Sequence, residues 1–413
     1  MSEIILRPYQ QAAVNAVISN IHENTNDIVS IAAGGGKSLV ISEVARRISG
    51  NILILQPNKE ILQQNYAKLA RYVPQKQLGI YSASLNSRSI KKYTFATIGS
   101  IYKKPDLFQD VDLVLLDESH LCDVAKSKTM YMKFFKDIGY PKVIGLTATP
   151  YRNVQTYKDV GGGKFSSTLS VQLINRMHPP FWDKMLFVTN IKYLIDNGYL
   201  SPLKYEDHSF LPQEKLKLNT SRSDFDLDAF EKVESSFRGN VLDTIRQCEK
   251  RFRSVLVFCS TVNQAFTLSG LIKGSEAISG ETKAISRDRI TKGFLDGSIK
   301  TVFNVGVLTT GYDNPALDCI IMLRPTKSLS LWVQMVGRGT RIAEGKTHCT
   351  VIDFTDTVNK LGRVETLELK QINNQWEVVT EKDSFHGKII SSITMKKPKR
   401  KRGKVAGNLL KGV

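Results

Sequence analysis

The stretch Ile31-Ala32-Ala33-Gly34-Gly35-Gly36-Lys37-Ser38 decides the expected fold. It follows the apolar run Ile28–Ala32 and precedes the helical periodicity of Ser38–Ile48. Glycines let backbone N–H groups approach phosphates, and a helix N-terminus adds a favourable dipole. Lys37 would then reach the β- and γ-phosphates of a nucleotide, and Ser38 would ligate Mg²⁺. The common form of this loop begins with glycine, where Ile31 stands here. A glycine-rich turn without a ligand is the alternative.

A second chemical signal lies where the apolar run Val111–Leu116 ends, at Asp117-Glu118-Ser119-His120. A strand this apolar is expected to be buried in a parallel sheet, and ligands bind beyond the carboxyl ends of such strands. Asp117 is then placed to bind Mg²⁺, and Glu118 to orient or deprotonate an attacking water. Alone, such a pair is typical of a solvated turn; the phosphate-binding pattern upstream favours the catalytic interpretation.

Strands and helices alternate over the first 150 residues, which predicts a doubly wound parallel sheet. The strand candidates are Ile28–Ala32, Ile52–Leu55, Tyr93–Ala96, Val111–Leu116 and Val143–Leu146, and helical periodicity fits Gln10–Ile21 and Ser38–Ile48. A second α/β pattern begins near Asn240, with strand candidates at Val255–Phe258, Thr301–Val305, Cys319–Leu323 and Cys349–Ile352. The fold class expected is therefore α/β, with two parallel sheets flanked by helices.

The pattern divides the chain into four parts. Residues 1–153 and 239–360 are the two expected domains. Residues 154–238, where Gly161-Gly162-Gly163 predicts a loop, form a linker or insertion of unknown role. Residues 361–413 are a C-terminal extension, with a hairpin of Thr366–Ile372 and Gln375–Val379 followed by a basic tail. The basic residues of that tail are Lys396, Lys397, Lys399, Arg400, Lys401, Arg402 and Lys404.

The composition favours a polyanionic partner. The 413 residues include 58 Lys and Arg against 39 Asp and Glu, a formal net charge of +19. Each neutralised phosphate releases a condensed counterion, so such an excess favours nucleic acid, with a merely solubilising surface as the alternative. The five cysteines are scattered without a C-x-x-C pair, which fits a reducing compartment and argues against a zinc module or a disulfide framework. No long apolar run is present, so a cytoplasmic protein without a membrane span is expected.

In motif order, the chain resembles superfamily-2 helicases from residue 5 to about residue 355. Leu6-Arg7-Pro8-Tyr9-Gln10 resembles the upstream adenine-reading element, and Thr147-Ala148-Thr149-Pro150 resembles motif III. The resemblance implies two tandem RecA-like domains that use ATP and Mg²⁺. The nucleotide-binding residues it implies in this half are Arg7, Gln10, Gly34, Gly35, Gly36, Lys37 and Ser38. Lys37, Asp117 and Glu118 are implied to be catalytic, and Ser38 and Asp117 to hold the metal. His120, Thr147 and Thr149 are implied to couple nucleotide state to nucleic-acid grip.

The resemblance continues through the remaining motifs. Residues 56–62 resemble motif Ia, 97–100 motif Ib, 258–261 motif IV, 307–313 motif V and 334–341 motif VI. The nucleic-acid contacts this implies are Pro57, Asn58, Thr97, Ser100, Ser260, Thr309 and Thr310. Gly311 and Asp313 are implied to lie near nucleotide, and Gln334, Arg338 and Arg341 to be catalytic. Arg338 and Arg341 are three residues apart, so in a helix they share one face and both suit the role of arginine finger.

Within the superfamily, Gly311–Pro315, Leu323–Thr326 and Val351–Phe354 look most like RadD-like DNA helicases and phage branch-migration helicases of the phage T5 kind. Restriction-enzyme motor subunits are also similar there. The chain departs from the former in lacking a C-terminal cysteine cluster, and from the latter in lacking an evident nuclease or methyltransferase segment. The expected function is ATP-dependent unwinding or remodelling of forked or branched DNA, in bacterial or phage-infected cytoplasm and plausibly by a monomer. An RNA helicase and a duplex translocase or ATP-gated binding protein without strand separation remain alternatives. Trp182 is a candidate strand-separating wedge, with local packing as the alternative, and Trp332 is expected to pack internally.

Overall fold

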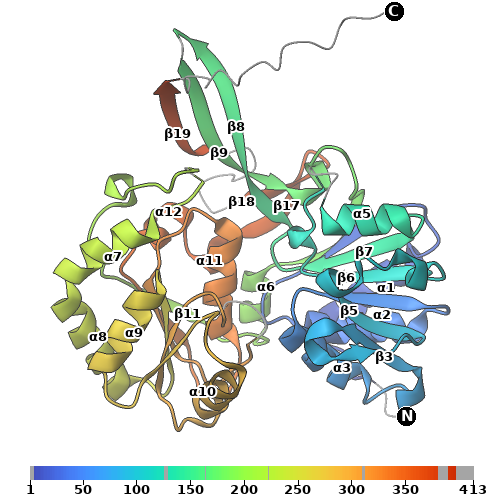
Figure 1. Cartoon of the computed structure of the whole chain (residues 1–413), viewed down its shortest axis with the longest axis horizontal. Helices are drawn as coiled ribbons and strands as arrows, with labels where there is room; N and C mark the ends of the chain where they lie inside the picture. Colours follow the sequence, from blue (N-terminus) through green and yellow to red (C-terminus); the bar gives the residue numbers. More distant parts are fainter. Residues whose placement is uncertain are drawn as a thin grey trace, which may run out of the picture.

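Two parallel β-sheets with flanking helices form the body of the molecule, and a long antiparallel arm projects from it (Figure 1). The computed structural model describes residues 4–124, 129–162, 164–221, 223–308, 312–379 and 389–396. None of the helices within these ranges is long and apolar enough to cross a membrane. The architecture confirms the predicted α/β class with two RecA-like domains.

The first sheet contains the strands that the apolar runs predict. In spatial order its described strands are β10 (Lys184–Thr189), β1 (Asp27–Ile31), β7 (Lys142–Thr147), β6 (Leu113–Asp117), β2 (Ile52–Gln56), β5 (Tyr93–Thr97), β3 (Leu78–Ser82) and β4 (Ser87–Arg88). Neighbouring strands are parallel except β3 and β4. The helices of this part are α1 (Pro8–Ser19), α2 (Lys37–Arg47), α3 (Lys59–Leu69), α4 (Ile98–Ile101), α5 (Met130–Asp137) and α6 (Ile191–Asp196). Every residue of β1, β2 and β6 is buried, as expected for central strands covered on both faces.

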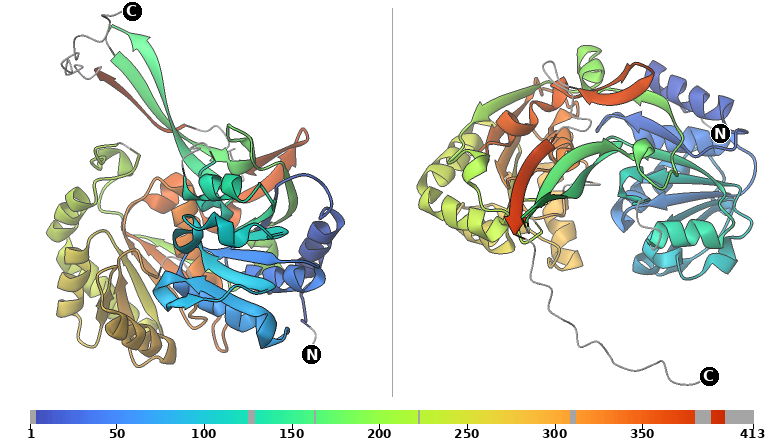
Figure 2. Two further views of the ribbon diagram at one scale, coloured as in Figure 1. Left: turned by 45° about the vertical axis from the view of Figure 1, so that its right-hand side comes forward. Right: turned by 90° about the horizontal axis from the view of Figure 1, so that it is seen from above.

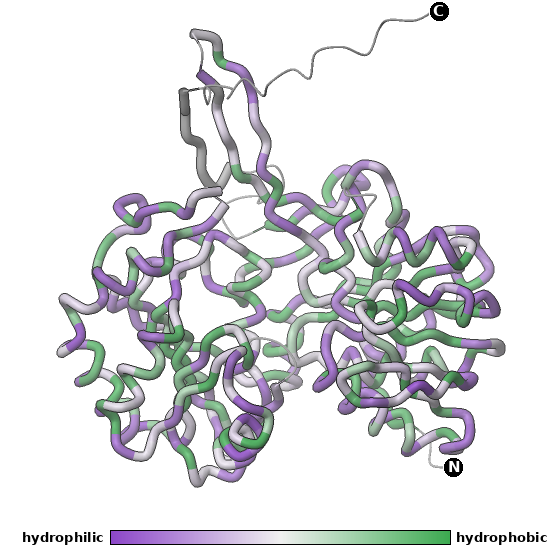
Figure 3. The backbone as a smooth tube through the Cα atoms, in the orientation of Figure 1, coloured by the Kyte–Doolittle hydropathy of each residue, from purple (hydrophilic) through white to green (hydrophobic). Residues whose placement is uncertain are grey.

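The second sheet is parallel throughout. Its described strands run in the order β11 (Leu203–Asp207), β16 (Cys349–Asp353), β15 (Cys319–Leu323), β12 (Val255–Cys259), β14 (Thr301–Asn304) and β13 (Glu276–Ile278). Its helices are α7 (Leu227–Ser236), α8 (Arg238–Arg251), α9 (Val262–Leu271), α10 (Ala284–Asp296), α11 (Leu329–Val336) and α12 (Thr357–Leu361). In Figure 3 the central strands of both sheets are largely hydrophobic.

The segment 154–238 is not a simple insertion or linker. Its strand β10 pairs with β1 in the first sheet, and its strand β11 pairs with β16 in the second. The first sheet therefore extends beyond residue 153, and the second begins before residue 239. Strand β11 was missed because polar residues interrupt its apolar pattern at a sheet edge, whereas the apolar run Met185–Val188 of β10 was an available signal.

The start of the same segment forms the arm. Strand β8 (Tyr151–Gly161) pairs antiparallel with β9 (Lys164–Leu173), and β19 (Ile389–Lys396) from the C-terminal extension pairs with the other side of β9. The views of Figure 2 show this ribbon standing away from both domains. The triple glycine begins, as predicted, at a turn, because Gly161 and Gly162 have positive φ at the hairpin end.

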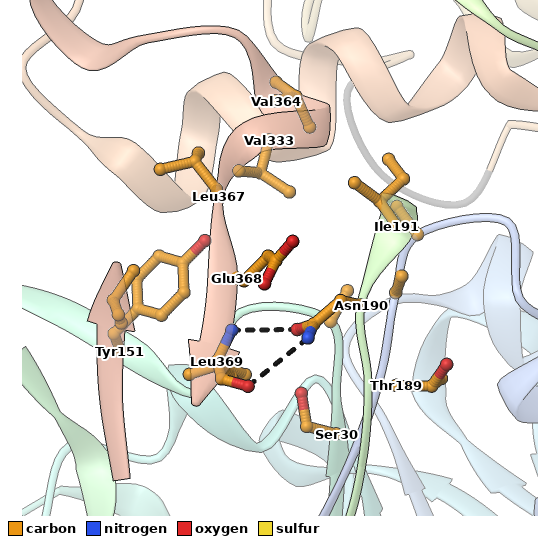
Figure 4. Close-up of a pocket in the computed structure, with 14 residues that line it drawn as sticks. Ser30, Tyr151, Thr189, Asn190, Ile191, Val333, Val364, Leu367, Glu368 and Leu369 are labelled. Atoms are coloured by element: carbon orange, nitrogen blue, oxygen red, sulfur yellow. Dashed lines mark hydrogen bonds between the residues drawn. The ribbon is translucent and has the colours of Figure 1, made fainter. Parts of the chain in front are cut away.

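The predicted C-terminal hairpin is present as β17 (Glu368–Ile372) and β18 (Gln375–Val379). Asn373 and Asn374 both have positive φ, as a tight two-residue hairpin turn requires. Asn190, just after β10, fastens the hairpin to the first domain (Figure 4). Its side-chain amide donates to the Leu369 carbonyl at 3.3 Å, and its side-chain oxygen accepts from the Leu369 N–H at 2.8 Å.

Both tryptophans singled out by sequence serve packing. Trp182 is 2% exposed and lies edge-on to Phe181 at 4.9 Å, so the wedge interpretation is wrong and the packing alternative holds. Trp332 of α11 is fully buried, and its indole N–H donates to the Gly362 carbonyl at 2.9 Å.

Candidate active site

The loop between β1 and α2 has the backbone of a phosphate cradle. Gly34 and Gly36 have φ of +80° and +78°, values that L side chains rarely adopt. Helix α2 begins at Lys37, directly after Gly36, so its free N–H groups face the loop. A Cβ at Gly36 would lie 2.5 Å from the Gln10 side-chain nitrogen, so close approach also requires glycine there.

Tyr9 and Gln10 of α1 hold this loop in place through hydrogen bonds. The side-chain nitrogen of Gln10 donates to the Gly35 carbonyl at 3.0 Å, and the Tyr9 hydroxyl donates to the same carbonyl at 2.8 Å. The Arg7 guanidinium donates to the Tyr199 carbonyl at 3.2 Å and lies 4.9 Å from the centre of the Tyr199 ring. Gln10 therefore contacts the loop, whereas Arg7 contacts Tyr199, and nucleotide binding by both stays a prediction. Tyr199 had no motif to single it out.

Asp117 and Glu118 end β6 opposite Lys37. Lys37 Nζ lies 3.5 Å from Glu118 Oε1, and both side chains are largely buried. Glu118 has a φ of +50°, a strained conformation that directs it out of the strand line. Burial and the neighbouring Glu118 raise the pKa of Asp117, while Asn65 donates to Asp117 Oδ2 at 3.2 Å. The two carboxylates thus meet the loop lysine at the carboxyl edge of the sheet, as predicted.

A further cation, Lys68 of α3, reaches the same cleft. Its Nζ donates to Ser38 Oγ at 2.5 Å, and the charges near it include Asp313, Arg341 and Asp117. Burial lowers the pKa of Lys68. Sequence reasoning missed Lys68 and Asn65. Their spacing of three residues, which places both on one face of α3, was the available signal.

Motif VI brings two arginines to the opposite wall. Arg338 and Arg341 both donate to the Tyr312 carbonyl, at 2.8 and 3.2 Å, and Arg341 also pairs with Asp313. Burial and the neighbouring Arg341 lower the pKa of Arg338 to about 10, so its guanidinium stays charged at neutral pH. A Cβ at Gly337 would lie 2.6 Å from the Ala33 Cβ, which shows how closely the second domain approaches the phosphate loop.

The two walls enclose one cleft, lined by residues of both domains. They include Gly34, Gly36, Lys37, Ser38, Asn65, Lys68, Asp117, Glu118, Asp313, Gln334, Arg338 and Arg341. Gly35 lies in the same loop. Gly311, implied to lie near nucleotide, is outside the described residues.

A buried polar chain crosses the cleft beside the carboxylates. His120 Nδ1 lies 2.8 Å from Thr147 Oγ1, 3.4 Å from Thr149 Oγ1 and 3.4 Å from Glu118 Oε2. On its other side, His120 Nε2 lies 3.0 Å from the side-chain nitrogen of Gln334 in the second domain. An amide nitrogen only donates, so His120 Nε2 accepts and the neutral ring carries its proton on Nδ1. The three residues implied to couple the nucleotide and nucleic-acid sites therefore lie together, and His120 contacts the second domain.

The residues implied to contact nucleic acid differ in their surroundings, and several of their side chains are engaged within the protein. Pro57 is half-buried, and the Asn58 side chain caps α3 by accepting from the Ile61 N–H at 2.9 Å. The hydroxyls of Thr97 and Ser100 lie 2.9 Å apart. Ser260 is buried, and its hydroxyl donates to the Leu323 carbonyl at 2.7 Å. Thr309 and Thr310 are outside the described residues.

Two family models match the chain, one in each domain. Residues 3–152 match the family described as "Type III restriction enzyme, res subunit", and residues 238–343 match "Helicase conserved C-terminal domain". The putative ATP-dependent helicase IRC3 of Saccharomyces cerevisiae is 28% identical, over 94% of this chain and 57% of its own length. The 51.5 kDa protein of Lactococcus phage (isolate 7-9) is 26% identical, over 76% of this chain and 62% of its own. The chain thus spans less than two thirds of the length of these relatives.

Solved structures share the fold at low identity. The Type ISP restriction-modification enzyme LlaBIII bound to DNA has a TM-score of 0.62 and 17% identity, over 85% of this chain and 28% of its own. Dbp5 of S. cerevisiae bound to RNA and ADP BeF3 has a TM-score of 0.56 and 14% identity, over 87% of both chains.

Fold and cleft together define a tandem RecA-like protein whose phosphate loop faces arginines of its second domain. The order of its motifs, the two matched family models and the helicase relatives support superfamily 2 of the helicases as its class.

Proposed function

We propose that the chain hydrolyses ATP in the cleft between its domains and couples the cycle to unwinding or remodelling of DNA. One observation carries the proposal: Lys37 and Glu118 of the first domain share a cleft with Arg338 and Arg341 of the second. Hydrolysis then requires the two domains to close on the nucleotide, which links the chemical step to domain movement.

The charges of the cleft suit in-line attack of water on a phosphate. Burial raises the pKa of Glu118, but the opposing effect of Lys37, His120 and Arg338 is larger. The pKa of Glu118 therefore lies below its ordinary value. Glu118 is therefore ionised and able to orient the attacking water through a hydrogen bond. Lys37, Arg338 and Arg341 supply positive charge where the transferred phosphoryl group gains negative charge.

The residues around Ser38 fit a magnesium ion. A hydroxyl and a nearby carboxylate, Asp117, are the hard oxygen ligands that Mg²⁺ takes together with phosphate oxygens and water. The ammonium of Lys68 already lies against Ser38 Oγ, so this position accepts a cation. Bound there, Mg²⁺ would neutralise phosphate charge, with Ser38 and Asp117 holding it.

DNA is the favoured substrate, and forked or branched DNA the favoured form. The net charge of +19 suits a polyanion, and the matched families include restriction-enzyme motors, one of whose structural neighbours is titled as bound to DNA. An RNA substrate is the second candidate, because the structural neighbour Dbp5 is titled as bound to RNA.

Steady-state ATP hydrolysis tests the proposal. It is measured without nucleic acid and with single-stranded DNA, duplex DNA, a four-way junction and RNA. Lys37→Ala is compared with the parent, and Lys250→Ala, at an exposed position of α8, is the matched control. We expect branched DNA to stimulate most, Lys37→Ala to abolish turnover and the control to match the parent. Stimulation by RNA alone would refute the DNA assignment, and no hydrolysis under any condition would refute the enzyme.

A further inference from the structure

In the outer half of the arm, strand β8 buries little of its surface. Strand β8 pairs with β9 from Tyr151 and Leu173 at its base to Gly161 and Lys164 at its end. Beyond Gln155, every described residue of β8 is exposed, so both of its faces meet solvent there. Antiparallel hairpins without a covered face are marginally stable, so burial does not explain why the chain extends this far.

The side chains at the end of the arm suit contact with a large anion. Lys158 and Lys164 are exposed, as are Tyr157 at 60% and Val160 at 50%. The nearby carboxylate of Asp159 accepts a hydrogen bond from the Gly161 N–H at 3.0 Å. At the base of the arm, by contrast, Arg152 pairs with Asp123 at 3.3 Å. The exposed lysines therefore lie toward the tip of the arm.

The third strand of the arm ends at the same tip. Strand β19 runs antiparallel to β9, and its last residue, 396, is the register partner of Lys164. In the sequence, the basic residues Lys397, Lys399, Arg400, Lys401, Arg402 and Lys404 follow, and they lie outside the described residues. More than 200 residues of sequence separate β19 from β8.

We propose that the tip of the arm binds the phosphate backbone of double-stranded DNA outside the nucleotide cleft. The inference rests on the proposed function for the choice of DNA, whereas the arm itself is independent of the cleft. Duplex DNA carries one charge per about 1.7 Å of helix axis, so a few lysines at a projecting tip gain most from a duplex.

The test is the salt dependence of binding by the full chain. Lys158→Gln/Lys164→Gln is compared with the parent, using labelled duplex DNA, its single strand and duplex RNA, by fluorescence anisotropy over a range of salt. Each neutralised phosphate contributes about 0.9 to the slope of log K against log salt. We expect the double variant to lower the magnitude of the slope on duplex DNA by about 1.8. Binding to the single strand and ATP hydrolysis without nucleic acid should stay unchanged.

A second double variant controls for general loss of charge. Lys250→Gln/Lys273→Gln removes two exposed lysines that precede β12 and β13, at the amino edge of the second sheet. It should bind as the parent does. An unchanged slope in the arm variant, or an equal fall in the control variant, overturns the inference while leaving DNA-stimulated hydrolysis and the proposed function standing. An equal fall on the single strand overturns the assignment to a duplex, and a fall on duplex RNA alone overturns the assignment to DNA. A parent that binds no nucleic acid overturns both proposals.

Discussion

Helix α3 adds a lysine side chain, Lys68, to the nucleotide cleft outside the helicase motifs. The Lys68 ammonium is largely buried against Ser38 Oγ, with Asp117 and Asp313 among its charged neighbours. A buried charge persists only where opposite charges and hydrogen bonds compensate its desolvation. Here the compensating groups belong to both domains, so the stabilisation of the Lys68 charge depends on the position of the second domain.

Replacing Lys68 with methionine keeps most of the side-chain volume and removes the charge. We expect kcat for ATP hydrolysis to fall by about 100-fold, the size of effect seen when one preorganised donor is removed from a reacting centre. Steady-state kinetics with separate determination of kcat and KM provides the measurement. Lys76→Met, at an exposed position outside the cleft, is the matched control. A kcat equal to that of the parent would assign Lys68 a purely structural role.

The cleft residues that the sequence predicted in the first domain share one property, because Lys37, Asp117 and Glu118 each follow or end a buried strand. Lys37 follows β1 by way of the glycine loop, and Asp117 and Glu118 end β6, so topology alone brings them to one sheet edge. Lys68 could not be found in this way because the direction of a helical side chain depends on how the helix packs. Ser260 shows the converse, since it follows a buried strand yet its hydroxyl turns inward to Leu323.

Among the secondary-structure elements, the C-terminal hairpin depends most on one side chain. The Asn190 side chain bonds both the N–H and the carbonyl of Leu369, as a neighbouring strand would. It follows β10 directly, so it ties β17 to the first domain although β17 follows the second domain in sequence.

Asn190→Ala removes both bonds and leaves backbone groups of Leu369 without a partner. We expect the free energy of unfolding to fall by about 1–3 kcal/mol, the cost of an unsatisfied buried polar group. Chemical denaturation followed by circular dichroism measures it. Asn197→Ala, whose side chain donates to the Tyr193 carbonyl at an exposed site, is the control and should change little. Equal effects of the two substitutions would mean that the hydrogen bonds between Asn190 and Leu369 contribute no more to the free energy of unfolding than an exposed hydrogen bond does.

Strands were most readily predicted where burial is complete on both faces. The runs that became β2, β6, β12 and β15 are uniformly buried. The partly buried hairpin of β17 and β18 was predicted from the turn between its strands, whereas the alternating polar residues of the edge strand β11 hid it. Strand β19 depends on β9, more than 200 residues earlier, and no local signal encodes such a pairing.

At the scale of the whole molecule, polar contacts at the start of α11 hold the domains together. The Asn153 side chain donates to the Lys327 carbonyl at 2.8 Å, and the Ser330 hydroxyl donates to the Tyr151 carbonyl at 2.9 Å. With the contact between His120 and Gln334, they join the base of the arm, the carboxylate edge and motif VI. Displacement of one domain must therefore disturb groups near Glu118.

The histidine in this set makes the assembly sensitive to acid. Burial lowers the pKa of His120 despite the nearby Glu118, so the folded state favours the neutral ring. Protonation would place an N–H on Nε2, opposite the amide that now donates to it. The unfolded chain binds this proton more readily, so the contribution of His120 is fully present above its ordinary pKa of about 6.5 and is lost as pH falls through the lowered value.

Comparison with a variant that does not titrate isolates this contribution. In His120→Gln the amide oxygen can accept from Gln334 at any pH. We expect the thermal midpoint of the parent to fall more steeply than that of His120→Gln as pH is lowered from 7 to 5, with parallel curves at higher pH. Curves that stay parallel throughout would show that His120 keeps the same protonation state in the folded and unfolded chain.

Strand β10 also determines how the molecule can be divided. It pairs with the outer side of β1, the strand that leads into the phosphate loop. A recombinant fragment ending at residue 153 would leave that side of β1 with a row of unsatisfied main-chain donors and acceptors, which invites edge-to-edge aggregation. A continuous fragment that contains the nucleotide-binding half must therefore include the β8–β9 hairpin and end beyond Thr189. A fragment that ends before β10 would expose the edge of β1, the strand that leads into the phosphate loop.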